Sequence, residues 1–176
     1  SFVVLGGGAI ALEMTHYLEG LGRKVTLIQR SPSLLSTLDK DCGEVVSEAF
    51  RKRGIDVYCG TSVQRVERTT AGIRVSFKDG DADRVVEAEE ILVATGREAA
   101  TAGLNCQAAG IKLKGMKIQV DETMCSSAPH IFAAGDVCSR ATPGFSRSGV
   151  HAVKAGPVLA NNLLSILADM PPQAEY

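Results

Sequence analysis

A glycine-rich hexapeptide near the start of the chain constrains the fold more than any other feature. Residues 6–11 read Gly-Gly-Gly-Ala-Ile-Ala and follow the short apolar run of residues 2–5. Residues 9–21 then carry apolar side chains at helical spacing, and Gly22 ends this pattern. This order of strand, glycine turn and helix matches the G-x-G-x-x-G/A dinucleotide fingerprint, with Ala11 in its third position.

The positions of this fingerprint have separate physical roles. Gly6 permits the tight turn, Gly8 leaves room for a pyrophosphate, and Ala11 is small enough for the helix to pack on the strand. The free N–H groups of a helix N-terminus attract phosphate oxygens. The alternative is a glycine turn without a ligand, which the ordered strand, helix and second strand disfavour. We therefore predict a dinucleotide site that includes Gly6, Gly7, Gly8, Ala9, Ile10 and Ala11.

The end of the second expected strand, residues 25–28, bears on the choice of nucleotide. In such units an acid about 20 residues after the glycines usually accepts a hydrogen bond from the adenosine ribose. Here Gln29 stands in that place, followed by Arg30 and Ser31. The missing carboxylate removes repulsion against a 2′-phosphate, and a guanidinium can bind one in bidentate fashion. The pattern favours NADP over NAD and leaves NAD as the alternative.

The remainder of the first half predicts an α/β fold with a Rossmann-like parallel sheet, covering helices and a β-meander. Alternating strands and helices with short links imply right-handed crossovers in a parallel sheet. The later change to short alternating strands predicts the meander. The expected elements are a helix at 39–53, a strand at 55–58, meander strands at 63–66, 73–77 and 84–86, and a buried strand at 91–94.

The sequence after Gly96 is richer in loops. We expect strands at residues 117–120 and 130–134, the second ending at Gly135. An apolar helix is expected over residues 150–167.

Composition excludes several classes of function. A formal net charge of −1 with interleaved acids and bases offers no basic field for nucleic acid. The longest apolar stretches are far shorter than the roughly 20 residues that span a bilayer. The five cysteines form no C-x-x-C and no zinc signature, so we expect no metal site and a reduced, cytoplasmic protein.

Three phrases in this order resemble the FAD-dependent pyridine nucleotide-disulfide oxidoreductases. They are Gly-Gly-Gly-Ala-Ile-Ala-Leu-Glu at 6–13, Ala-Thr-Gly-Arg at 94–97 and Ile-Phe-Ala-Ala-Gly-Asp at 131–136. The resemblance covers nearly the whole chain. It implies that residues 1–96 are a NAD(P)-binding domain inserted into a split FAD-binding domain. Residues 97–176 would then be the C-terminal part of that FAD domain.

The resemblance also implies further site residues. Glu13 would lie near the nicotinamide ribose, and Thr95 and Gly96 would border the nucleotide. Gly135 and Asp136 would bind the flavin, with Asp136 at its ribityl chain. The helix beginning near residue 150 would direct its N-terminus toward the flavin ring, where reduced flavin carries negative charge.

The expected function is that of a portion of a larger enzyme, which passes hydride from NAD(P)H to FAD and on to an unidentified acceptor. No catalytic residue is assigned, because no redox-active cysteine pair and no second glycine fingerprint occur in these residues. Ser1 is not an initiator Met, so we expect upstream residues that supply the missing half of the FAD domain. The chain alone should be inactive, and a homodimer is possible. The alternative is a stand-alone nucleotide-binding module without redox activity.

Overall fold

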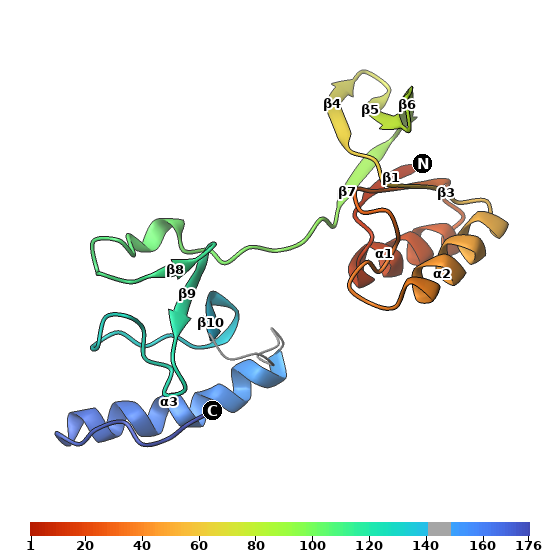
Figure 1. Cartoon of the computed structure of the whole chain (residues 1–176). Coiled ribbons are helices and arrows are strands. Elements are labelled where there is room, and N and C mark those ends of the chain that lie inside the picture. Colours follow the sequence, from red (N-terminus) through yellow and green to blue (C-terminus); the bar gives the residue numbers. More distant parts are fainter. Residues whose placement is uncertain (141–148) are drawn as a thin grey trace. The chain divides into compact units, whose positions relative to one another are not determined.

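The computed structural model describes residues 1–140 and 149–176, and the chain divides into two compact units. Unit 1 comprises Ser1–Gly96 and unit 2 comprises Arg97–Tyr176. Both units are shown in Figure 1, where colour follows the sequence.

Unit 1 is built on a four-stranded parallel sheet in the order β3-β2-β1-β7. Helices α1 and α2 connect β1 to β2 and β2 to β3. The bounds are β1 Phe2–Leu5, α1 Ala9–Gly20, β2 Val25–Gln29, α2 Lys40–Lys52, β3 Asp56–Cys59 and β7 Glu90–Val93. The α/β fold with a parallel sheet is therefore confirmed.

Strands β1 and β2 lie in the middle of the sheet, and both of their faces are covered. On one face Val4 and Leu27 pack in a cluster with residues of both helices. On the other face Val3 and Ile28 pack against the strands that follow β3. All four side chains are at most 3% exposed. This burial explains why β1 and β2 read as continuous apolar runs rather than as alternating patterns.

The covering strands form the expected β-meander, an antiparallel sheet of β4 Val63–Thr69, β5 Gly72–Asp79 and β6 Ala82–Ala88. Ile73, Val75 and Phe77 alternate along β5 and are all buried. Phe77 meets Tyr58 edge to face, with ring centroids 4.9 Å apart. Arg74, the exposed residue between Ile73 and Val75, forms an ion pair with Glu87 on β6, with its guanidinium nitrogen 2.7 Å from the carboxylate oxygen. The alternation therefore places an apolar face on the sheet and a charged face in solvent.

Unit 2 has a smaller three-stranded sheet in the order β10-β9-β8, followed by a long helix. Its core includes Ile118, Val120, Met124, Cys138 and Ala155. The bounds are η1 Ala102–Leu104, β8 Leu113–Lys114, β9 Lys117–Val120, η2 Gly135–Val137, β10 Cys138–Arg140 and α3 Gly149–Leu167.

The prediction of a strand at residues 130–134 is wrong. That run makes one isolated bridge, between Phe132 and Cys125, and the strand forms later, at β10. Met124 adopts a φ of 68°, so the neighbouring segment cannot stay extended and the ladder ends after one bridge. The apolar run is half-buried without regular pairing, whereas Cys138–Arg140 pairs in parallel with β9.

The last residues of the chain fold back on unit 2, where side chains that include Asn162, Arg140 and His151 contact them. Asn162 of α3 is fully buried and bonds Thr123, Gln173 and Ala174 through backbone groups at 2.8–3.1 Å. Arg140 donates to the Tyr176 carbonyl oxygen and lies 3.4 Å from a Glu122 carboxylate oxygen.

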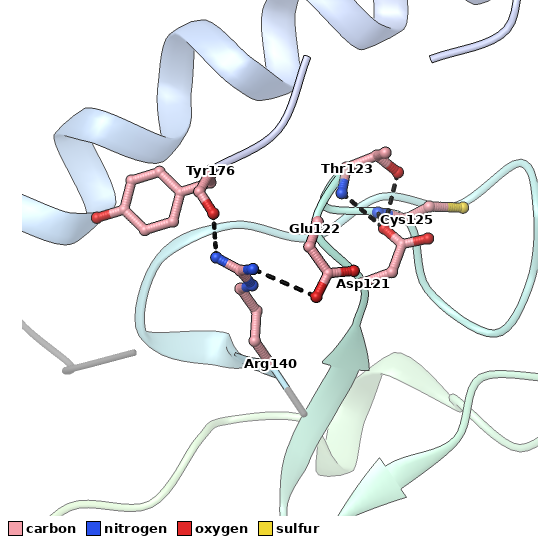
Figure 2. A network of polar contacts seen from close by, with 6 residues as sticks. All are labelled: Asp121, Glu122, Thr123, Cys125, Arg140 and Tyr176. Atoms are coloured by element: carbon pink, nitrogen blue, oxygen red, sulfur yellow. Dashed lines mark hydrogen bonds and ion pairs between the residues drawn. The ribbon is translucent and has the colours of Figure 1, made fainter. Parts of the chain in front are cut away.

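Figure 2 shows the Arg140 guanidinium directed at both of these groups, from the end of β10. The guanidinium carbon also lies 5.8 Å from the centre of the Tyr176 ring, within the range of a cation–π contact. In the part of the chain that the structure describes, no helix is both long and apolar enough to cross a membrane.

Candidate functional site

The turn between β1 and α1 brings two loops of unit 1 into close contact. Gly6 has a φ of 126°, which side-chain-bearing residues rarely adopt. A Cβ placed on Gly6 would lie 2.3 Å from the backbone oxygen of Ala94, in the loop after β7. The N–H of Ala94 in turn donates to the Leu5 carbonyl at 2.8 Å. Only glycine at position 6 therefore allows the loops after β1 and β7 to meet.

These loops lie at the point where the strand order of the sheet reverses. β1 pairs with β2 on one side and with β7 on the other, all in parallel. The crevice outside the carboxyl ends of such strands is the usual ligand position in open α/β sheets. Residues 6–8 and 94–96 follow β1 and β7 at this edge.

The start of α1 offers unoccupied space and free donors. A Cβ on Gly8 would meet no heavy atom within 4 Å, although the same addition at Gly6 would clash. No side chain caps α1, and its first turn contains no acid. The first N–H groups of the helix, beginning at Ala9 and Ile10, therefore remain available to an anion. Ala11 is fully buried, which lets α1 pack close to the turn. The residues present fit a dinucleotide pyrophosphate.

The loop after β2 lies beside the glycine turn. The Gln29 side chain lies against Gly7, because a Cβ on Gly7 would come within 2.6–2.8 Å of its atoms. Its Oε1 atom accepts the Arg30 N–H at 3.0 Å. Arg30 is exposed, and among residues 1–140 and 149–176 no salt bridge engages its guanidinium. Ser31 accepts the Gly60 N–H at 2.8 Å, which ties this loop to the end of β3.

The other predicted residues of unit 1 are accessible. Glu13 is exposed on α1, one turn beyond the first helical residues. Thr95 and Gly96 are exposed in the loop after β7, and Gly96 has a φ of 126°. The structure thus brings the predicted residues of unit 1 to the carboxyl ends of its strands or to the first half of α1.

The two predicted residues of unit 2 lie at the start of η2. Gly135 has a φ of 77°, and a Cβ on it would lie 3.6 Å from the Cβ of Ala152 in the first turn of α3. Asp136 is exposed in the same short helix. The short helix that carries Asp136 therefore begins close to the first turn of α3.

Sequence reasoning missed two parts of the site in unit 1. The backbone oxygen of Ala94 is what requires glycine at position 6, and its only sequence signal is its place just after β7. The contact of Gly7 with Gln29 joins residues 22 positions apart, and no local pattern predicts it.

A nearby hollow of about 240 Å³ beside α2 is lined in part by Cys59, which carries a thiol. Burial raises the pKa of that thiol, and Arg51 only partly opposes the shift. Cys59 is therefore a poor nucleophile at neutral pH.

The family model described as pyridine nucleotide-disulphide oxidoreductase matches residues 1–157. The chain belongs to this family. A mercuric reductase of Staphylococcus aureus is 35% identical over 164 residues, which are 93% of this chain and 29% of that protein. A dihydrolipoyl dehydrogenase of Chlorobaculum tepidum is 34% identical over 138 residues, which are 78% of this chain and 29% of that protein. This family membership confirms the resemblance read from the three sequence phrases.

A solved structure shows the same fold. The water-forming NADH oxidase from Lactobacillus brevis, bound to NADH, has a TM-score of 0.84 at 22% identity, over 99% of this chain and 38% of that one. The chain thus spans less than a third of the length of the mercuric reductase and of the dihydrolipoyl dehydrogenase, and under two fifths of the oxidase.

Proposed function

We propose that this chain is the NAD(P)H-binding portion of a flavin-dependent oxidoreductase. Unit 1 would be the NAD(P)-binding domain, and unit 2 the C-terminal part of a split FAD-binding domain. In the whole protein, hydride would pass from NAD(P)H to FAD and on to an acceptor that is not identified. The observation that carries the proposal is the open space at Gly8 above the uncapped start of α1.

Several features of unit 1 support nucleotide binding at this edge. An anionic pyrophosphate would meet the N–H groups of the first turn of α1, where no carboxylate competes for them. Glu13 lies one turn further along the helix, and Thr95 and Gly96 follow the neighbouring strand. The NADH held by the oxidase of similar fold agrees with a nicotinamide nucleotide as the ligand.

We propose NADP as the preferred nucleotide and NAD as the alternative. Gln29 carries no charge that would repel a 2′-phosphate, and its amide oxygen already accepts the Arg30 N–H. The exposed Arg30 guanidinium, without a salt bridge in the described part of the chain, could bind the phosphate.

For unit 2 we propose contacts to the flavin from Gly135, Asp136 and the start of α3. When bound, FAD supplies the two-electron chemistry of hydride acceptance. The N-terminus of α3 would favour negative charge nearby, and the Asp136 carboxylate could accept hydrogen bonds from hydroxyl groups.

Calorimetric titration of the chain with NADPH tests the nucleotide proposal. Gly8→Val should abolish binding, because the branched side chain fills the space proposed for the pyrophosphate. The fold should survive, since a Cβ there meets no neighbour. Gly20→Val is a matched control, because Gly20 also has open space but lies at the other end of α1. A folded Gly8→Val protein that binds NADPH normally would refute the proposal.

A further inference from the structure

Gly7 contacts the Gln29 side chain, and the dinucleotide fingerprint does not require this contact of its second residue. That position accepts any residue in the fingerprint, whereas Gly6 and Gly8 are specified. In this chain, a Cβ on residue 7 would lie 2.6 Å from Cδ, 2.7 Å from Cγ and 2.8 Å from Nε2 of Gln29. The absent side chain of Gly7 therefore provides the space that the Gln29 side chain uses.

The Gln29 amide in this position makes a hydrogen bond to the backbone of the next residue. Its Oε1 accepts the N–H of Arg30 at 3.0 Å. Gln29 ends β2, and its carbonyl accepts the Thr61 N–H at 3.2 Å, so its backbone is fixed from the neighbouring loop. One end of the side chain is thus anchored by the sheet and the other by the first backbone group of Arg30.

We propose that Gly7 and Gln29 act as a pair that positions Arg30 and sets the nucleotide preference. This inference rests on the proposed nucleotide site. While Gly7 keeps its space open, the Gln29 amide stays folded over the turn and leaves the neighbourhood of Arg30 to a phosphate. Gly7 and Gln29 are positioning residues, and Arg30 is the group that would contact the adenosine 2′-phosphate.

Substitution of Gly7 by alanine isolates this effect. The atoms that an added methyl group would meet belong to a flexible side chain, so Gln29 is expected to move and the backbone to stay. The moved amide loses its hydrogen bond to Arg30 and enters the space beside the guanidinium. By contrast, a methyl group on Gly6 meets the Ala94 backbone, which cannot give way as easily. Gly7→Ala should therefore fold normally and bind NADPH less well.

The test measures dissociation constants for NADPH and NADH with the 1–176 chain. Gly7→Ala should weaken NADPH binding by about three- to tenfold, the size expected for one displaced hydrogen-bonded side chain, and NADH binding less. In a Gln29→Ala background, Gly7→Ala should change neither constant, because no side chain remains to be displaced. Gly8→Ala is the control in the same turn, and its loss should persist in both backgrounds because it acts on the ligand directly.

Each outcome decides the proposal. Equal losses for Gly7→Ala in both backgrounds, or no loss in either, would overturn the pairing while leaving the nucleotide site intact. A wild-type chain that binds neither nucleotide would overturn the proposed function, and the pairing with it. If Gly7→Ala did not fold, Gln29→Met would serve instead, because it keeps the length of the side chain and removes the hydrogen bond. NADPH affinity unchanged in Gln29→Met would then contradict the role of the Gln29 amide.

Discussion

The two units of the chain differ in where their exposed apolar side chains lie. Those of unit 1, such as Ile10, Val45 and Val93, are spread over several elements, whereas many of those in unit 2 lie on α3. In unit 1, the parallel sheet is covered by helices on one face and by the meander on the other. In unit 2, the strands have two to four residues, and α3 leaves Val150, Val153, Leu164 and Leu167 between 62% and 82% exposed. Exposed apolar stripes of this kind are usually covered in a functional assembly. Unit 1 should therefore be stable by itself, whereas unit 2 should depend more on its surroundings.

Removal of a large core side chain from unit 1 should give the largest effect on stability. Phe77→Ala deletes a fully buried ring that meets Tyr58, so we expect a loss of about 3–5 kcal/mol in the free energy of unfolding. Phe132→Ala in unit 2 is the matched variant, and it should cost less because Phe132 is only half-buried. Denaturant unfolding, with hydrogen exchange read for each unit, measures both losses. Equal losses would contradict the difference between the units.

Asn162 tests the attachment of the C-terminal residues to unit 2. Asn162→Ala removes the hydrogen bonds to backbone groups of Thr123, Gln173 and Ala174 and should cost about 1–3 kcal/mol. The amides of Gln173 and Ala174 should then exchange faster with solvent. Asn161→Ala is the control, because its side chain is exposed. Unchanged exchange at both amides would show that Asn162 does not hold this segment.

The preference for NADPH over NADH should change on substitution in unit 1 and not on substitution in unit 2. Arg30→Ala should weaken NADPH binding by about 1–3 kcal/mol, the usual loss for a hydrogen bond to a charged group, and leave NADH nearly unchanged. Asp136→Asn in unit 2 should change neither affinity. Calorimetry with both nucleotides measures these effects. Equal losses of NADPH and NADH on Arg30→Ala would refute the proposed 2′-phosphate contact.

The smallest predicted effect concerns the buried thiol of Cys138 in unit 2. Burial raises the pKa of this thiol above its ordinary value, and Asp136 adds to the shift. The unfolded chain therefore loses the proton first as pH rises, so stability falls above about pH 8.5 and is fully present below it. Cys138→Ala should flatten this dependence in urea unfolding measured from pH 7 to pH 10. An unaltered slope would contradict the shift.

The sequence predicts features that depend on local pattern and misses those set by distant contacts. The turn at Gly6 and the alternation along β5 follow from neighbouring residues, and both are present in the structure. The expected strand at 130–134 is absent because Met124, in an adjacent segment, takes a left-handed conformation. Cys138–Arg140 has no apolar alternation and becomes a strand only through pairing with β9. The Gly7 contact with Gln29 likewise depends on the tertiary fold.

Titration of the isotope-labelled chain with NADPH, followed by backbone amide chemical shifts, tests the nucleotide site most directly. The largest changes should fall on residues 6–11, on Gln29 to Ser31, and on Thr95 and Gly96, because these groups surround the carboxyl ends of β1, β2 and β7. Amides of unit 2 should change little. Shifts concentrated in unit 2, or around Lys24 and Asp56 beside the amino ends of β2 and β3, would contradict the proposed site.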